Sequence, residues 1–245
     1  MCGRFVTPEE ATIERYWHIG RHNHNPFKRR FNVRPTDTIP FLRLPSDSDE
    51  LELATGRWGL VPRWWEEDAK LPTMTHNARL EEAARKPMWS DAWRRARCLI
   101  PAEGWYEWQP VERADPATGE IKPAKQPHFI RRTDGRLFCF AGLMSHCKNP
   151  QTGEALRSCA IVTAQATGSL AQIHKRAPVV LPESAHAEWL DRKLTDSAKV
   201  KAIAEARVPP AEFTHYKVRL LVNNAKADGP ELIEPADEPE SNRHE

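Results

Sequence analysis

The feature that most constrains the fold of this chain is a series of short apolar or alternating segments bounded by turn residues. Successive side chains of a β-strand point to opposite faces, so such segments predict strands with at least one buried face. The segments do not alternate regularly with helices, which argues against a parallel sheet of βαβ units. The pattern predicts an α+β fold with curved antiparallel sheets, whose strands lie at residues 38–44, 51–60, 98–102, 105–109, 128–132, 137–143, 157–163 and 214–220.

Helices are expected at the margins of these sheets. Thr7, Pro8 and Glu10 have the order of a capping box, which predicts the start of a helix. Pro87 interrupts a second helical pattern, because proline cannot donate to the preceding turn. The predicted helices cover residues 7–20, 80–95 with this interruption, 182–192 and 195–206.

The remaining segments are expected to be loops and turns. We expect a polar, basic loop at residues 22–30. The closeness of residues 98–102 and 105–109 predicts that these two strands form a hairpin. Residues 110–127 are rich in proline and charge, which predicts an irregular excursion on the surface.

The distribution of charge indicates the domain organisation and the kind of partner. No linker divides the chain, so we expect one domain over residues 1–235 and a disordered, polar acidic tail over residues 236–245. Residues 228–245 hold seven acids and one base, which leaves 35 bases and 27 acids in the body, a charge of +8. A basic body favours a polyanionic partner.

The sequence lacks the signatures of common cofactor and metal sites. It has no P-loop, no Gly-x-Gly-x-x-Gly and no His-Glu-x-x-His. Five cysteines without a Cys-x-x-Cys pair argue against a disulfide framework and against a zinc cluster. No stretch approaches the roughly 18 apolar residues of a membrane span, and no signal peptide is visible. We therefore expect a cytoplasmic monomer without a metal or cofactor.

Cys2 is the candidate nucleophile because of its place in the chain. After removal of Met1 it would carry an α-amine with a pKa of ~7.7–8.0 and a thiol with a pKa of ~8.5 on adjacent carbons. An amine attacks an aldehyde to give a Schiff base, and a neighbouring thiolate can then close a thiazolidine ring. The alternative, that a cysteine stands at this position by chance, remains open from these two residues alone.

Two polar segments carry further candidates. Asn77 offers both a donor and an acceptor, and Arg79 could hold a phosphate through its fork of donors. His174 lies beside Lys175 and Arg176, which disfavour its cationic form and suit it to acid–base work near neutrality. A helix cap and a basic surface loop are the ordinary interpretations of these segments.

Two aromatic segments complete the set of candidates. Strand alternation places Glu107 on the face of Trp105, where apolar surroundings would raise its pKa and suit it to proton transfer. A cross-strand salt bridge is the alternative role for this acid. Adjacent Trp64 and Trp65 beside Arg63 could stack on unpaired bases, or could pack in the core.

Six short motifs occur in a fixed order along the chain, and together they resemble the SRAP family of SOS-response-associated peptidases, or abasic-site processing proteins. The resemblance runs from Cys2 to about Pro235. The motifs are Cys2-Gly3-Arg4-Phe5, Asn32-Val33-x-Pro35, Arg57-Trp58-Gly59-Leu60-x-Pro62, Asn77-Ala78-Arg79-x-Glu81, Gly104-Trp105-Tyr106-Glu107-Trp108 and Ile173-His174-x-Arg176-x-Pro178.

The resemblance implies a single compact domain with a barrel-like β core and a reaction with abasic sites in single-stranded DNA. Cys2 would form a thiazolidine with the ring-opened aldehyde, and Asn77 would orient the adduct. Glu107 would assist the terminal amine and its proton transfers. His174 would act as acid or base on the deoxyribose, in ring opening and in slow reversal of the crosslink.

The resemblance also implies which residues contact DNA and which accessory activities occur. Members of the family act in the DNA damage response and are described as removing Met1 by autoproteolysis, and some cleave at abasic sites as lyases. The protein would be associated with the nucleoid when bound to DNA. The implied DNA-binding residues are Arg4, Asn32, Pro35, Trp64, Trp65, Arg79, Trp108 and Arg176.

Two other classes of function remain as alternatives. An N-terminal-nucleophile amidohydrolase would use Cys2 as a thiol nucleophile on a small amide, without dependence on DNA. A non-enzymatic single-stranded DNA-binding module would bind in a salt-sensitive manner and form no covalent product.

Overall fold

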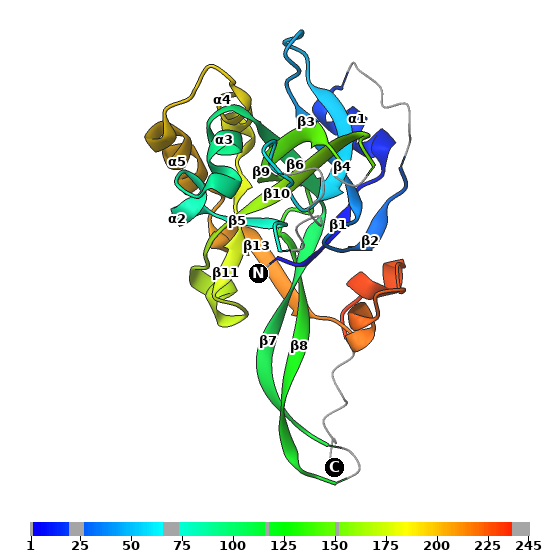
Figure 1. Cartoon of the computed structure of the whole chain (residues 1–245). Coiled ribbons are helices and arrows are strands. Elements are labelled where there is room, and N and C mark those ends of the chain that lie inside the picture. The colour runs from blue at the N-terminus through cyan, green and yellow to red at the C-terminus, as the bar shows by residue number, and fades with distance from the viewer. Residues whose placement is uncertain (1, 20–26, 66–73, 116–117, 150–151, 237–245) are drawn as a thin grey trace.

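The computed structural model describes residues 2–19, 27–65, 74–115, 118–149 and 152–236. Two curved sheets form its centre, and helices lie along their edges (Figure 1). This arrangement confirms the predicted α+β fold with a barrel-like core.

Five strands of the larger sheet close into a barrel. The hydrogen-bonded order is β10–β4–β3–β6–β9, and β9 pairs again with β10. All of these pairs are antiparallel except β10–β4, which is parallel and was not expected. The strands are β3 (Thr38–Arg43), β4 (Glu52–Trp58), β6 (Arg97–Ala102), β9 (Phe138–Lys148) and β10 (Ala155–Gln165).

Three short strands extend this sheet at the edge nearest the candidate site. β5 (Asn77–Arg79) pairs with β10 in parallel, and β11 (Arg176–Pro178) pairs with β10 in antiparallel orientation. β12 (Val180–Leu181) pairs with β9. Residues distant in sequence therefore meet along β10.

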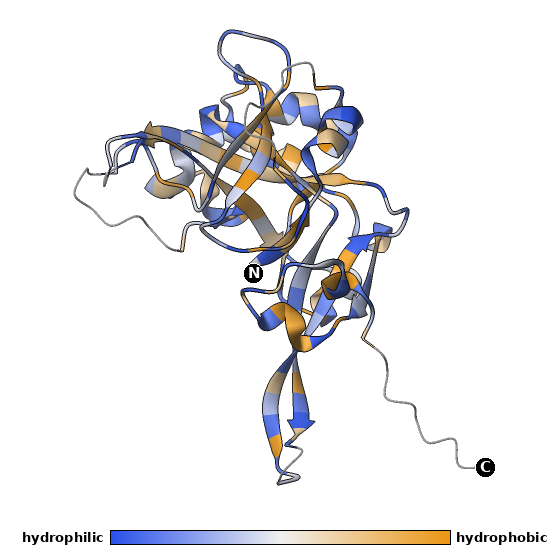
Figure 2. Ribbon diagram, turned by 90° about the vertical axis from the view of Figure 1, so that its right-hand side faces the viewer, coloured by the Kyte–Doolittle hydropathy of each residue, from blue (hydrophilic) through white to orange (hydrophobic). Residues whose placement is uncertain are grey.

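The second sheet has the order β13–β8–β7–β1–β2. Its strands are β1 (Arg4–Thr7), β2 (Arg30–Val33), β7 (Gly104–Ala114), β8 (Ile121–Arg132) and β13 (Phe213–Lys217). The distal halves of β7 and β8 leave the sheet and project as a two-stranded arm, residues 109–126, which both views show extending away from the body (Figures 1 and 2).

Helices lie at the margins, as expected. Pro87 occupies the first turn of a new helix, which explains the interruption of the pattern at residues 80–95. Asp196 caps α5 by accepting from the backbone N–H groups of Ala198 and Lys199. The α-helices are α1 (Glu10–Trp17), α2 (Leu80–Ala83), α3 (Pro87–Arg95), α4 (His186–Leu190) and α5 (Ser197–Glu205). The 3-10 helices are η1 (Gly168–Gln172), η2 (Glu183–Ala185), η3 (Pro210–Glu212), η4 (Leu220–Asn223) and η5 (Pro230–Ile233).

Aromatic side chains fill the space between the barrel and the second sheet. The rings of Phe5 and Trp58 meet edge to face with centroids 5.0 Å apart, and Trp105 contacts Phe213 in the same manner at 5.3 Å. Phe5 and Trp105 come from β1 and β7, so this cluster fixes the two strands that flank the N-terminus.

The predicted start of the first helix was wrong. Thr7 is the last residue of β1, and α1 begins at Glu10 without a side-chain cap. The Glu10 carboxylate accepts instead from the backbone N–H of Phe27 at 3.0 Å. Pairing of residues 4–7 with β2 and β7 satisfies more backbone groups than a cap would, and it overrides the local signal.

Two predictions about the centre of the chain were also wrong. Residues 98–102 and 105–109 form no hairpin, because β6 joins the barrel while β7 joins the second sheet. Residues 110–127 are no irregular excursion, because most of them continue β7 and β8 as a regular ladder from Gln109↔Gln126 to Ala114↔Ile121. Pro110 and Pro123 are tolerated because a two-stranded arm has two open edges.

Candidate active site

Cys2 lies at the start of the N-terminal strand, between the barrel and the second sheet. The strand β1 runs between β2 and β7, with Phe5 opposite Trp105 and Arg4 opposite Tyr106. The Cys2 side chain is fully buried in the apolar cluster that contains Phe5. Burial, reinforced by the nearby Glu107 carboxylate, raises the pKa of this thiol well above its usual value. The thiol is therefore protonated at neutral pH.

Glu107 is the buried acid of the site. It lies in β7 and is only 3% exposed. Burial raises the pKa of this carboxyl to about 7, so both protonation states are populated near neutral pH. Trp105 packs in the cluster of Cys2, whereas Tyr106 and Trp108 belong to the cluster on the other face, as strand alternation predicted.

Asn77 connects the barrel to the N-terminal strand. Its Nδ2 donates to the carbonyl oxygen of Cys2 at 2.7 Å. Its Oδ1 is buried and has no hydrogen-bond partner among the described residues. The parallel pairing of Asn77 with Ile161 fixes the backbone that carries this amide. One end of the amide thus holds Cys2, and the other end is an acceptor available to a further donor.

His174 lies on the solvent side of Glu107. Its Nδ1 is 3.7 Å from Oε2 of Glu107 and 3.0 Å from the carbonyl oxygen of Arg176, so the same ring nitrogen contacts both residues. Partial burial lowers the pKa of the imidazole, and the charges of Lys175 and Lys125 lower it further. The ring is therefore largely neutral at pH 7 and is 24% exposed in its side chain. The structure thus brings together all four predicted reactive residues.

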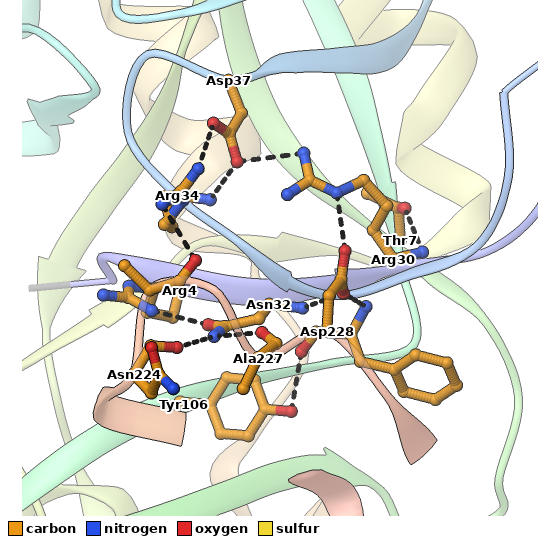
Figure 3. A network of polar contacts seen from close by, with 12 residues as sticks. Arg4, Thr7, Arg30, Asn32, Arg34, Asp37, Tyr106, Asn224, Ala227 and Asp228 are labelled. Carbon is orange, nitrogen blue, oxygen red and sulfur yellow. Dashed lines mark hydrogen bonds and ion pairs between the residues drawn. The ribbon is translucent and has the colours of Figure 1, made fainter. Parts of the chain in front are cut away.

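Arg4 and Asn32 form a network with the C-terminal part of the chain (Figure 3). Asn32 is 1% exposed, and its Oδ1 accepts from Nη1 of Arg4 at 2.7 Å. Its Nδ2 lies within 2.8 to 3.3 Å of three carbonyl oxygens, those of Val222, Asn224 and Ala227. The Asn32 side chain makes its hydrogen bonds to groups inside the protein. It therefore supports the Arg4 side chain.

The C-terminal segment of this network, residues 220–228, is called the strap here. Asp228 accepts from the backbone N–H groups of Phe31 and Asn32 and pairs with Arg30 at 3.0 Å. Trp108 Nε1 donates to Asn223 at 2.8 Å, so the strap also holds a predicted DNA-binding residue of β7. In the sequence Asp228 is one acid among several in an acidic stretch, and this pattern gives no signal of such a contact.

The other predicted DNA-binding residues surround the site with unequal exposure. Arg176 is bound to Glu81 by two hydrogen bonds of 2.8 and 3.1 Å and has a largely covered side chain. Arg79 has a side chain that is 54% exposed. Pro35 is half-buried in the turn after β2. The ion pair with Glu81 was missed, although Glu81 stands in one of the motifs.

The tryptophan pair lies at the surface. Trp64 is 56% exposed, so core packing is excluded for this ring, and Trp65 is half-buried beside it with centroids 5.7 Å apart. The backbone N–H of Trp65 donates to the carbonyl of Pro62, which fixes the turn. The Trp64 ring is therefore exposed at this surface beside the Trp65 ring.

Within the described part of the chain, no three His, Cys, Asp or Glu side chains are grouped as metal ligands would be. Among the helices that the structure describes, none is long and apolar enough to cross a membrane.

Comparison of the chain with known protein families identifies its class. The chain belongs to the SOS response associated peptidase (SRAP) family, whose model matches residues 1–225. It is 33% identical over 241 residues to the abasic site processing protein YoqW of Bacillus subtilis, covering 96% of this chain and 99% of that protein. It is also 33% identical over 243 residues to YedK of Escherichia coli, likewise an abasic site processing protein, covering 96% of this chain and 100% of the other.

The fold is shared with solved structures. A protein from Bacteroides thetaiotaomicron superimposes with a TM-score of 0.75 at 22% identity, covering 95% of this chain and 99% of that one. At this identity the likeness concerns the fold alone.

Proposed function

We propose that this protein processes abasic sites in single-stranded DNA by forming a covalent crosslink through Cys2 after Met1 is removed. The relatives named as abasic site processing proteins support the substrate class. The observation that carries the proposal is the convergence of Asn77 and Glu107 on Cys2, the second residue of the chain. Neither His174 nor Glu107 requires a metal to transfer protons.

The chemistry proceeds in two bond-forming steps. The α-amine of Cys2 attacks the aldehyde carbon of the ring-opened sugar, and loss of water gives an imine. The Cys2 sulfur then adds to the imine carbon, and its proton passes to the nitrogen through Glu107, which closes the thiazolidine. Because burial keeps the thiol protonated, Glu107 in its ionised form, whose charge acts on this thiol, is the base that takes this proton.

Three accessory activities use the same residues. Hydrolysis of the Met1–Cys2 peptide bond, by the protein itself or by an aminopeptidase, releases the α-amine. His174 protonates or deprotonates the deoxyribose oxygen in ring opening and in slow reversal of the crosslink. In a lyase reaction, removal of a proton from the carbon next to the imine would break the adjacent bond to the 3′ phosphate oxygen.

The DNA strand follows the predicted contact residues across this face. Arg79 supplies an exposed cation, and Trp64 and Trp65 supply stacking faces. Arg4 and Trp108, held by the strap, line the other side. Asn32 acts through Arg4, to which it is bound, and Arg176 acts through Glu81, to which it is bound. Pro35 shapes the turn beside them.

A denaturing gel with labelled single-stranded DNA containing one abasic site tests the proposal. Wild-type protein and Cys147→Ala, a control at a half-exposed cysteine, should give a shifted band that survives heat and SDS. Cys2→Ala should give none, and duplex DNA should give a weak band. Mass spectrometry should show that the reactive protein lacks Met1.

The alternatives predict different results. Salt-sensitive binding that survives Cys2→Ala, with no covalent band from protein lacking Met1, would support a binding module. Hydrolysis of a small amide in the absence of DNA would support an amidohydrolase.

A further inference from the structure

The side chains of His174 and Glu107 come from different parts of the fold. His174 lies in the segment between η1 and β11, and the backbone N–H of Ala166, just after β10, donates to the carbonyl of Lys175 at 3.0 Å. This segment is therefore fastened to the barrel, whereas Glu107 lies in β7 of the second sheet. The distance of 3.7 Å between Nδ1 of His174 and Oε2 of Glu107 depends on how the two sheets are joined at this place.

The side chain of Gln109 makes such a join. It lies two residues after Glu107 in β7, so both side chains point to the same face of the strand. Its Nε2 donates to the carbonyl oxygen of Gln172 at 3.1 Å. Gln172 is the last residue of η1 and stands two residues before His174. One amide thus connects a point two residues from Glu107 with a point two residues from His174.

His128 holds the other end of this amide. It lies directly opposite Glu107 in the β7–β8 ladder and is 6% exposed. Because the amide nitrogen of Gln109 donates to a carbonyl, Oε1 of Gln109 is the atom that faces His128, and Nε2 of His128 lies 3.1 Å from it. An amide oxygen can only accept, so Nε2 of His128 carries the ring proton and donates it. The orientation of the Gln109 amide is fixed at both ends.

The surroundings of His128 favour this one tautomer. Burial lowers the pKa of the ring to about 4, and the charges of His215 and Lys217 act in the same direction. The ring is therefore neutral at pH 7 and carries a single proton. Its Nδ1 is buried and has no hydrogen-bond partner among the described residues, so a proton on Nδ1 would gain no bond there. The donor that Gln109 needs is thus present throughout the neutral pH range.

We propose that Gln109, oriented by His128, is a positioning residue for the reaction at Cys2, and that it holds the His174 imidazole against Glu107. The inference rests on the proposed function for the role of His174 as an acid or base on the deoxyribose. Gln109 acts through the backbone of the His174 segment and needs no contact with DNA.

The segment that carries His174 also has anchors of its own. Leu170 and Ile173 are buried in the apolar cluster that contains Cys2. The backbone N–H of His174 donates to the carbonyl of Leu170 at 3.1 Å. Loss of the Gln109 bond should therefore leave the fold intact and loosen the His174 ring, so a positioning role can be measured in a folded variant.

The first test is an NMR titration of the His174 ring in the protein without DNA. Burial is the largest cause that lowers the pKa of this ring, and the charges of the amino terminus, Lys175 and Lys125 lower it further. Glu107, which faces the ring from β7, is mostly protonated over the pH range in which His174 titrates, so its charge has little effect there. A loosened ring gains exposure, and its pKa should rise toward ~6.5, the value of a free histidine.

Gln109→Met is the variant that should show this rise. Methionine keeps the length of the side chain but cannot donate to Gln172 or accept from His128. In the same spectra, the ring nitrogens of His128 should show a proton on Nε2 in wild type and a mixture of tautomers in Gln109→Met. Gln126→Met is the matched control, because Gln126 lies opposite Gln109 on the same rung and donates instead to the carbonyl of Val218 at 2.9 Å.

The second test measures reversal of the crosslink. Purified crosslinked protein is mixed with excess unlabelled abasic-site DNA, and loss of the shifted band is followed on denaturing gels between pH 5 and 8. Reversal in Gln109→Met should be about tenfold slower than in wild type, within the range that misplacement of a reacting group costs. Its pH inflection should move upward with the pKa of His174. Gln126→Met should match wild type in both respects.

Two combinations connect the effect to the proposed contacts. His128→Phe keeps a ring but removes the donor to Gln109, so it should change reversal in the same direction by a smaller factor. The double variant of His128→Phe and Gln109→Met should be no slower than Gln109→Met alone. In a His174→Phe background, Gln109→Met should have no further effect on reversal.

The inference is overturned if Gln109→Met leaves the His174 titration unchanged, or if Gln126→Met slows reversal as much as Gln109→Met does. In either case a wild-type crosslink at Cys2 leaves the proposed function standing. Absence of a wild-type crosslink would overturn the proposed function, and the titration would then decide by itself whether Gln109 holds the His174 ring. If Gln109→Met does not fold, His128→Phe replaces it in both measurements.

Discussion

At the scale of single residues, the chemistry depends on a buried acid beside a buried thiol. Burial, together with the charge of Glu107, raises the pKa of the Cys2 thiol, and burial raises the pKa of Glu107 itself to about 7. Glu107 is therefore poised to exchange a proton near neutral pH, whereas the thiol keeps its proton until a base takes it. Asn77 keeps the Cys2 backbone in place while this happens.

The first prediction concerns Glu107→Gln and the rate of crosslinking. Glutamine keeps the shape of the side chain but cannot accept a proton. The wild-type rate should rise with pH through an apparent pKa of about 7, and the variant should be slower by about 100-fold without that inflection. Single-turnover gels between pH 5 and 9 measure both. An unchanged pH profile in the variant would exclude Glu107 as the base.

The second prediction concerns the same substitution and stability. The pKa of Glu107 is raised from 4.5 to about 7 on folding, so its neutral form is favoured in the folded state. The wild type thus loses up to about 3 kcal/mol of stability as pH rises from 4.5 through 7. Glu107→Gln should unfold at a temperature several degrees above wild type at pH 8.5, and at a similar temperature at pH 4. If the difference in unfolding temperature between Glu107→Gln and wild type grew toward acid pH, the predicted direction of this effect would be contradicted.

At the scale of elements, the N-terminal strand is held by pieces of chain from opposite ends of the sequence. The strap fastens to β2 through Asp228 and to Arg4 through Val222. The Tyr106 hydroxyl donates to the carbonyl of Phe31 at 2.8 Å, so β7 joins the same network. The position of Cys2, two residues before Arg4, depends on these contacts.

The third prediction concerns Asn32→Ala. Loss of the amide removes one of the two acceptors of Arg4 and the donor to the Ala227 carbonyl, so the free energy of unfolding should fall by about 2–3 kcal/mol. Hydrogen exchange of residues 220–228 should become faster. The rate of crosslinking should fall by a larger factor than the affinity for single-stranded DNA that carries tetrahydrofuran, an abasic-site analogue without an aldehyde. Asn32→Asp is the matched variant, since it keeps an acceptor for Arg4 but loses the donors to the strap. If hydrogen exchange of the strap stayed as slow as in wild type in both variants, the strap would not depend on Asn32.

The fourth prediction concerns the arm. Its outer rungs pair only with each other, and Ile121 near its end is 66% exposed. Replacing residues 110–125 by Asn-Gly between Gln109 and Gln126 should leave the melting temperature within a few degrees of wild type, because this dipeptide closes two-residue hairpins. Gln109 would keep its bond to the carbonyl of Gln172. Thermal unfolding followed by circular dichroism measures this; a loss of cooperative unfolding would show that the arm stabilises the body.

At the scale of the whole molecule, charge is divided between a basic body and an acidic end. The last described contacts are the bridge between Val218 and Pro235 and the bond from the Ala236 N–H to the carbonyl of Lys217. Residues 237–245, the greater part of the predicted disordered tail, lie outside the described residues. They carry four acids and one base.

The fifth prediction concerns truncation after Ala236. The folded contacts of Pro235 and Ala236 remain, so crosslink yield should stay within about twofold of wild type. Removal of net negative charge should tighten binding to single-stranded DNA slightly at low salt and not at high salt, where charges are screened. Titrations at two salt concentrations measure this. A large loss of yield would assign the tail a role in the reaction.

Much of the fold was predictable because its signals are local. The break at Pro87, most strands and the face of Glu107 follow from proline chemistry and from alternation over a few residues. Thr7 and residues 110–127 were misjudged because long-range pairing with other strands overrode a capping signal in one case and proline content in the other.

The sequence by itself determined the α+β class, the order of the motifs and the residues that carry reactive groups. Only the tertiary structure decided which of them meet. Asn77 reaches Cys2 across 75 positions, and Asn32 reaches the strap across as many as 196. The conformational preferences of short segments carry no information about such contacts. These contacts form when the closed barrel and the second sheet bury their shared apolar faces. The family resemblance implied a DNA-contact role for Asn32, and the fold shows that its side chain bonds to Arg4 and to the strap.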